Sequence, residues 1–214
     1  RPAFAVQARE LTQSQTILQN QIERFGDHMF KQGAMVIPGQ VSIDTQYYAV
    51  KLTSIDSSNT LAQFTTGTIL TGGTSGVTAE ITKTVATDGT DPDTIFVKYS
   101  KTGTNNTTDV FSDGETLTGT NSDSVSLSCV VDTTATGSAA GVQAGVYYIN
   151  GFFIQVDAST LILDKYTNSP SYRIGFTVTE SFVTPSDDSS LNDNAAGSSN
   201  VNAPGAHRFK ILLT

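Results

Sequence analysis

The sequence predicts a mainly β protein with one N-terminal α-helix, in which an antiparallel β domain carries an inserted small domain of β-hairpin repeats. Residues 8–31 lack proline and place apolar residues at helical spacing, whereas from Gln40 onward the apolar residues recur with a period of two. Residues 57–140 are rich in Thr, Ser, Gly and Asp and contain an internal repeat. These three observations predict the fold class.

The predicted helix carries a regular apolar stripe. Its later spacings of four and three residues are those of a coiled-coil seam, and polar Gln15 takes a seam position where an apolar residue is expected. We name as the helix seam Leu11, Gln15, Leu18, Ile22, Phe25 and Met29. Gly33 is a predicted helix stop, and Pro38-Gly39 predicts a turn. The seam fits equally a helix packed on its own sheet and a contact between subunits.

Strand signals lie on both sides of the insert. The clearest covers residues 146–156, where Asn150-Gly151 suits the positive φ angles of a type I′ hairpin. Further strands are predicted around residues 41–52, 160–163, 172–183 and 208–213. The strand around Tyr47 and the hairpin around Tyr147 read as halves of one sheet. We therefore expect a discontinuous assembly domain, residues 1–56 plus 141–214, with residues 57–140 inserted in one loop.

The insert repeats a strand, a Gly-rich turn and a second strand. Residues 67–72 match residues 114–119, and the apolar positions that follow recur in the same order, as Val77, Ala79 and Ile81 and then Val125, Leu127 and Cys129. Two such hairpins could bury one apolar face between them. Cys129 is the only cysteine, so it forms no intrachain disulfide, and its alternating position predicts a buried, unreactive thiol.

Composition narrows the classes of partner. Twelve basic and twenty acidic residues give a formal net charge of −8, which repels phosphate backbones, so we expect no nucleic-acid binding. No apolar run approaches the roughly 20 residues of a membrane span. The chain begins at Arg1, and we read it as a segment of a longer protein. Residues 184–206 are rich in Asp, Asn, Pro and Gly, and we interpret this long loop as an extended segment across a neighbour.

Few side chains offer chemistry. His28 and His207 lack partners at metal or triad spacing, and no nucleophile motif is present. Acidic residues cluster at 88–93 and 187–193, but the calcium-loop pattern is absent, and turn capping explains them better. We therefore expect no catalytic residue, no cofactor and no metal site. An enzyme such as a polysaccharide depolymerase is a weaker alternative, because no paired carboxylates stand in a recognisable context.

Paired aromatic residues offer a second candidate surface. In a strand, one residue of each pair at 47–48, 147–148 and 152–153 should point away from the core. Exposed aromatic rings can be buried between subunits or can stack on sugars. The absence of tryptophan favours the interface, for which Tyr147 and Phe153 are the candidates.

Two flanking stretches resemble a known class of protein. Residues 6–26 and 35–39 resemble the N-terminal region of virion structural proteins from tailed bacteriophages, especially marine cyanophages with contractile tails. Residues 172–180 and 202–211 are similar to a downstream part of the same proteins. The resemblance implies a part of a tail, baseplate or tail fibre, assembled in the host cytoplasm, and it brings no catalytic residues.

We therefore expect a non-enzymatic structural component of a phage virion that acts through contacts with other virion proteins and with copies of itself. A threefold homo-oligomer would suit the base of a fibre. The alternative is an adhesin module whose inserted β domain binds glycans of the host cell surface.

Overall fold

The computed structural model describes residues 7–197 and 199–214 and confirms a mainly β fold with a single N-terminal helix. The helix, α1 (Ala8–Met29), ends two residues before the predicted boundary, because Phe30 is already extended. Gly33, with φ of 80°, lies in the turn that follows. The strands are β1 (Ala34–Ile37), β2 (Val41–Ile55), β3 (Ile69–Gly72), β4 (Thr78–Val85), β5 (Thr94–Lys101), β6 (Thr116–Thr120), β7 (Ser126–Val142), β8 (Gly145–Ile149), β9 (Phe152–Val156), β10 (Ser159–Asp164), β11 (Val178–Val183) and β12 (Arg208–Leu213).

The elements form two compact units. The first unit contains the described residues of Arg1–Gln40, Gln143–Ser159 and Arg173–Thr214, and the second contains Val41–Val142 and Thr160–Tyr172. The second unit thus extends beyond the expected insert, residues 57–140. The reason is strand pairing, because β2 pairs with β7 along nearly its whole length and β10 pairs with the same strand.

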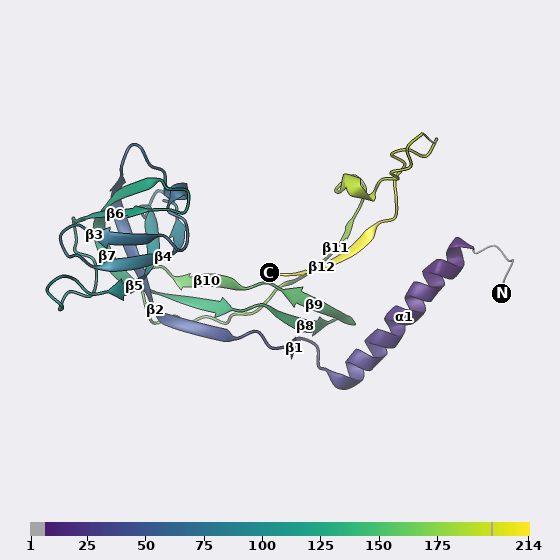
Figure 1. Cartoon of the computed structure of the whole chain (residues 1–214). Coiled ribbons are helices and arrows are strands. Elements are labelled where there is room, and N and C mark those ends of the chain that lie inside the picture. The colour runs from purple at the N-terminus through teal and green to yellow at the C-terminus, as the bar shows by residue number, and fades with distance from the viewer. Residues whose placement is uncertain (1–6, 198) are drawn as a thin grey trace. The chain divides into compact units, whose positions relative to one another are not determined.

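The second unit is a closed antiparallel barrel, drawn mostly in teal in Figure 1. Its strands follow the order β7-β2-β5-β4-β3-β6, and β6 pairs with β7 to close the circle. β10 is attached outside the circle, on β7. Closure leaves no free edge in the barrel, and alternate residues of each strand point inward.

The sequence repeat supplies the barrel's centre. The two matched segments form β3 and β6, which pair with each other so that Leu70 faces Gly119 and Gly72 faces Leu117. Leu70 and Leu117 are fully buried, and in the strands that follow Ala79, Ile81, Leu127 and Cys129 are at most 2% exposed. The expectation that the hairpins share one apolar face is confirmed, and the buried cluster consists of Val50, Leu52, Phe64, Leu70, Val77, Ala79, Ile81, Ile95, Val97, Phe111, Leu117, Leu127, Cys129 and Val131.

A second segment covers the outside of β2. Tyr47 stacks on Phe96 with the ring centroids 5.0 Å apart, and Ile162 and Tyr166 pack over this pair. Tyr48, on the other face of β2, packs against the barrel core, so both residues of this aromatic pair are covered within the unit. Tyr47 thus points away from the barrel core, as predicted, but it is not exposed, because residues 160–172 return over the face that the sequence pattern leaves open.

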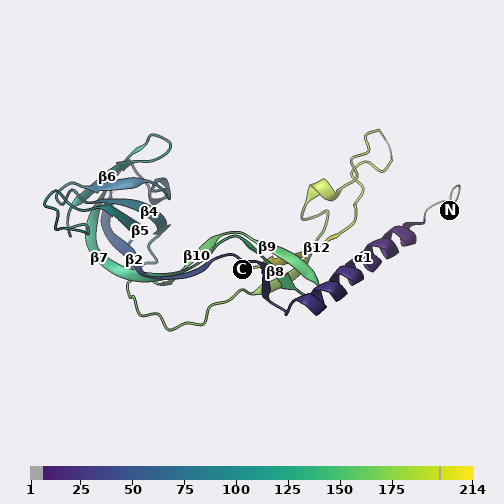
Figure 2. The same cartoon turned by 60° about the horizontal axis from the view of Figure 1, so that its bottom comes forward.

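The first unit has two small sheets, which Figure 2 shows from a second angle. β1, β8 and β9 form a three-stranded sheet, and β11 and β12 form a two-stranded ribbon. Asn150 and Gly151 have φ angles of 49° and 83°, which confirms the predicted hairpin between β8 and β9. β8 does not share a sheet with β2, so the expectation that Tyr47 and Tyr147 lie in halves of one sheet was wrong. Alternation identifies strands but not their partners.

Glu115 holds the two hairpins of the barrel together. Its buried carboxylate accepts hydrogen bonds from the backbone N–H groups of Thr74, Ser75 and Ser112, at 3.0, 2.9 and 2.7 Å, and from the Ser75 hydroxyl at 2.9 Å. Burial by itself would raise the pKa of Glu115, but these hydrogen bonds to its ionised form outweigh burial and lower the pKa.

We expect Glu115→Gln to destabilise the second unit by roughly 2–4 kcal/mol at neutral pH, because backbone donors lose a charged acceptor. Since the folded-state pKa lies below the unfolded value, the carboxylate stabilises the fold above the unfolded pKa, and this contribution is lost as the pH falls through the folded pKa. Urea unfolding between pH 7 and pH 3 measures both effects. Glu80→Gln, at an exposed position of β4, is the control, and equal stabilities of the two variants would contradict the prediction.

Candidate assembly surface

The helix seam is exposed to solvent in the single chain. The exposed fractions of its apolar members are 61% for Leu11, 60% for Leu18, 50% for Ile22, 61% for Phe25 and 63% for Met29. Gln15 is exposed as well. An apolar stripe of this length would normally lie against a partner, because burying such side chains is the main favourable term in folding and association.

The last turns of α1 are anchored to the sheet by a different face. The Tyr148 hydroxyl donates to the carbonyl of Glu23 at 3.0 Å and to the Asp27 carboxylate at 2.8 Å. Gly26 lies against the same ring, so closely that a Cβ there would stand 2.3 Å from Tyr148 Cε2. Tyr148 is completely buried, and burial together with the Asp27 carboxylate raises its pKa to about 12. The two views agree that this end of α1 lies at β8 and β9 (Figures 1 and 2).

The anchor and the seam occupy separate faces of the helix. At about 100° per residue, the centre of the face formed by Glu23, Gly26, Asp27 and Phe30 is rotated by roughly a third of a turn from the centre of the seam. The sheet can therefore hold the helix without covering the seam. Of the two readings that the sequence left open, the helix packed by its seam on its own sheet is not the arrangement in this chain.

Charge is distributed around α1 in a regular way. With Leu18 and Ile22 at heptad positions d and a, every charged residue within Arg9–Asp27 falls at position b, c or f, on the side away from the seam. These residues are Arg9, Glu10, Glu23, Arg24 and Asp27. The flanking positions e and g carry Thr12, Ser14, Gln19, Gln21, Gly26 and His28. The borders of the seam therefore carry no lysine, arginine, aspartate or glutamate.

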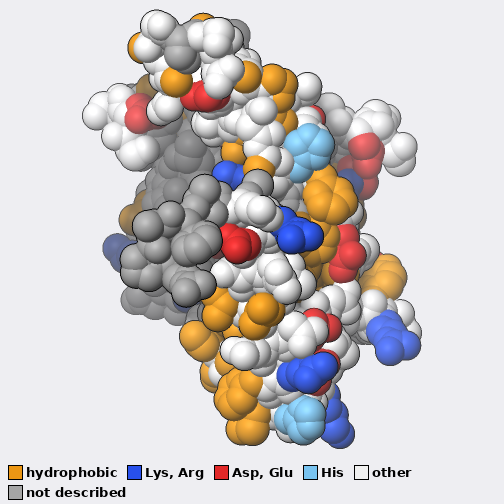
Figure 3. All heavy atoms as spheres, turned by 90° about the vertical axis from the view of Figure 1, so that its right-hand side faces the viewer, with side chains coloured by type: hydrophobic (Ala, Val, Ile, Leu, Met, Phe, Trp, Pro, Cys, Tyr) orange, Lys and Arg blue, Asp and Glu red, His pale blue; other side chains and the backbone are white. Residues whose placement is uncertain are grey.

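The aromatic candidates separate into one buried and one exposed residue. Tyr147 is buried under Phe176, with ring centroids 5.3 Å apart, so it belongs to the core of the first unit rather than to an exposed surface. Phe153 remains 41% exposed, with its edge contact to Phe30 at 5.8 Å. Figure 3 shows further hydrophobic side chains, in orange, at the surface of the face that it draws.

The first acidic loop binds a lysine of its own chain. Lys165 Nζ lies 3.1 Å from Asp88 Oδ2 and 3.2 Å from Asp91 Oδ2. Asp93 accepts from the backbone N–H of Thr87 at 2.8 Å. Hydrogen bonds from the backbone of Asp91, together with Lys165, lower the pKa of Asp88. This cluster joins residues 160–172 to the barrel and leaves its carboxylates occupied.

The second acidic cluster caps turns in the long loop. Asp187 accepts from the backbone N–H and the hydroxyl of Thr184, at 2.9 and 2.7 Å, and Asp188 accepts from the N–H of Ser190 at 2.9 Å. Asn192 and Pro204 form an isolated antiparallel bridge. The loop thus folds back on itself, and the expectation of an extended segment was wrong, because side-chain caps close turns that composition alone does not distinguish from open chain.

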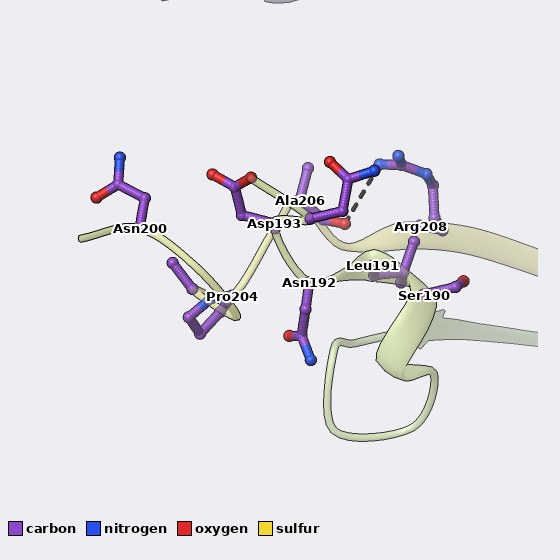
Figure 4. Close-up of a pocket in the computed structure, with 11 residues that line it drawn as sticks. Ser190, Leu191, Asn192, Asp193, Asn200, Pro204, Ala206 and Arg208 are labelled. Carbon is purple, nitrogen blue, oxygen red and sulfur yellow. Dashed lines mark hydrogen bonds between the residues drawn. The ribbon is translucent and has the colours of Figure 1, made fainter. Parts of the chain in front are cut away.

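This loop encloses an open hollow of about 670 Å³. Its labelled polar side chains do not converge in Figure 4, where Asn192 and Asp193 point in opposite directions. Arg208 Nη1 donates to the carbonyl of Ala206 at 3.2 Å, which ties the hollow to the start of β12. The arrangement offers no group of side chains directed at one point.

The cysteine and the helix histidine that the sequence singled out lie in different surroundings. Cys129 is buried as predicted, and burial raises its pKa to about 12. His28 Nδ1 lies 2.7 Å from the carbonyl of Arg24 on the exposed helix. Within residues 7–197 and 199–214, no group of three His, Cys, Asp or Glu side chains is placed to hold a metal ion. None of the helices in the described part of the chain has both the length and the apolar character that a membrane span requires.

We expect Gly26→Ala to destabilise the first unit by about 1–3 kcal/mol, because the added methyl group meets the hydrogen-bonded, buried ring of Tyr148. At an unconstrained helix position the same change would stabilise the chain by about 1 kcal/mol. Urea unfolding followed by circular dichroism, at one fixed protein concentration, compares Gly26→Ala with Ser14→Ala on the exposed part of α1. A Gly26→Ala chain as stable as the wild type would show that the anchor does not constrain the helix.

Comparison with known proteins gives one finding about the family. A family model described as a domain of unknown function, DUF4815, matches residues 95–214. The matched segment begins in β5 and continues through β12, so it includes the second half of the barrel and leaves α1 outside. No curated protein and no solved structure matches the chain. Since the family model covers more than half of the sequence, the chain belongs to the DUF4815 family.

Proposed function

We propose that the chain is a non-enzymatic structural subunit of a tailed-bacteriophage particle, located in the tail, the baseplate or the base of a tail fibre. It assembles with copies of itself through α1 and contacts other virion proteins. The observation that carries the proposal is the helix seam, which stays exposed although the same helix is anchored to its sheet by another face. The assignment to a phage particle is based on the resemblance of the flanking sequences to phage virion proteins.

The chemistry of the seam supports an identical helix as its partner. In a parallel homo-oligomer, position e of one helix lies beside position g of the next, so like charges at these positions would repel. The e and g positions of α1 carry no lysine, arginine, aspartate or glutamate, and the charged residues lie on the outer side. Leu11, Leu18 and Ile22 supply apolar side chains to the seam. Gln15 would pair with Gln15 of the next copy and would thereby select the register at some cost in stability.

The anchor supports a parallel arrangement. Each α1 ends at the Tyr148 anchor, so parallel helices would bring the first units of all copies together at one end. An antiparallel pair would separate them by the helix length, about 33 Å for 22 residues.

We expect the wild-type chain to be an oligomer and the double variant Leu18→Asp/Ile22→Asp to be a monomer, because two carboxylates per helix would lie in an apolar seam. Size-exclusion chromatography with light scattering measures the mass directly. The matched control is Gln13→Asp/Asn20→Asp, which adds the same charge at outer f positions and should leave the mass unchanged. An oligomer that survives the seam substitutions would refute the assembly surface.

The position in the particle needs a separate measurement. Antibody raised against the second unit, applied to purified phage particles and viewed by electron microscopy, should label the tail, the baseplate or the fibre bases. Particles that carry the protein on the capsid head, or not at all, would contradict the proposed location while leaving self-assembly intact.

One observation favours the alternative function, an adhesin. The barrel has a hollow of about 600 Å³ lined by polar side chains, in which Thr71, Thr118 and Ser128 lie opposite one another across β3, β6 and β7. Hydroxyl groups both donate and accept, as recognition of sugar hydroxyls requires. Asp56 also lines the hollow, and its Oδ1 accepts hydrogen bonds from the backbone N–H and the hydroxyl of Ser58, at 2.9 and 2.6 Å.

If the hollow binds glycans, the wild-type chain should bind a subset of the glycans on a host-envelope array. The double variant Asp56→Asn/Thr118→Val should weaken that binding about tenfold or more, because it removes one charged and one neutral hydrogen-bonding group. Thr107→Val, at an exposed loop position of the same unit, is the control. The adhesin reading fails if no glycan is retained, or if the double variant binds as the wild type does.

A further inference from the structure

We infer that the first unit reaches its stable fold only when copies of the chain assemble, whereas the second unit folds within one chain. The inference rests on the proposed assembly through α1. It adds that the partner completes the core of the first unit, so that the assembly surface includes the β11–β12 ribbon as well as the helix.

The two units differ in how much of their apolar surface they bury. The second unit encloses one contiguous apolar cluster inside a closed barrel. Among the described residues of the first unit, the buried cluster consists of Tyr147, Val156 and Leu213, with the partly buried Ile149, Ile154 and Phe176 packed against it and Tyr148 buried separately under the helix end. A unit of its length ordinarily needs a larger interior to offset the conformational entropy of ordering its backbone.

The β11–β12 ribbon is the part of the first unit that most clearly lacks a covering layer. Its register places Val178 opposite Leu213, Glu180 opposite Ile211 and Phe182 opposite Phe209, so these three pairs share one face. Leu213, at one end of this face, is buried with Tyr147 and Val156, so the uncovered part is the other end, at Phe182 and Phe209. Phe182 is 66% exposed and Phe209 is 45% exposed. An isolated two-stranded ribbon is marginally stable in water unless another layer covers its apolar face.

The ribbon is connected to the helix through one strand, β9. Phe152 contacts Phe209 of the ribbon, with ring centroids 5.4 Å apart. Its neighbour Phe153 contacts Phe30, directly after α1, at 5.8 Å. Successive residues of β9 thus contact the ribbon and the residue that follows the helix, so β9 joins the helix end to the ribbon.

This connection indicates what covers the ribbon. Parallel pairing of the seams brings the anchored helix ends of the copies together, and with them the ribbons that β9 attaches. The occupant is therefore the first unit of another copy of this chain. The apolar face would be continuous with the seam contact, and the second unit, with its closed barrel, would not take part.

Hydrogen exchange of the full-length chain, read by mass spectrometry, tests the inference. Wild-type protein is compared at concentrations above and below dissociation of the oligomer, and Leu18→Asp/Ile22→Asp is compared with Gln13→Asp/Asn20→Asp at one concentration. In the monomeric state, we expect protection of residues 146–156 and 208–213 to fall by about a hundredfold or more. Protection of residues 94–101 and 126–131, in the barrel, should change by less than about threefold.

The outcomes separate this inference from the proposed function. Undiminished protection of residues 146–156 and 208–213 in a monomeric chain would overturn the inference and leave assembly through α1 untouched. A parallel loss of protection in the barrel would also overturn it, because both units would then depend on assembly. A wild-type chain that is monomeric at every concentration would overturn the proposed function itself, together with the inference.

Discussion

The packing of Tyr148 against α1 is the contact that sets which face of the helix the sheet covers and which face stays exposed. The ring is fully buried, its hydroxyl bonds to Glu23 and Asp27, and Gly26 is the residue that lets the helix approach so closely. Because these groups occupy one face of the helix, the seam lies on another. A bulkier residue at position 26 would push the helix away from the ring, and the direction of the seam would no longer be set by the sheet.

The two units solve the problem of burying apolar side chains in different ways. The second closes its sheet through the β6–β7 pairing and so removes its edges, with Glu115, just before β6, bound to the turn between β3 and β4. The first leaves a three-stranded sheet and a ribbon open, with apolar residues on their faces. Within one chain, a closed unit that buries its apolar residues therefore stands beside an open unit that leaves many of them exposed.

Polar chemistry in this chain is used mainly for local structure. Asp88 and Asp91 bind Lys165, Asp187 and Asp188 cap turns, and the carboxylate of Glu115 accepts backbone hydrogen bonds. Carboxylates that already have such partners are poorly placed to bind ions or to transfer protons. The charged residues of α1 also stay away from the candidate contact surface, because they lie at outer heptad positions and leave the seam without charge.

The sequence by itself determined the element types, the internal repeat, the buried Cys129 and the seam residues, because periodicity, turn chemistry and heptad spacing are local properties. Tertiary structure decided which strands pair, that residues 160–172 cover Tyr47, that Tyr147 is core, and that residues 184–206 fold back on themselves. These depend on contacts between residues far apart in the chain, which a local pattern does not encode. The exposure of the seam belongs to the second group, since only the position of Tyr148 reveals which face of the helix the sheet uses.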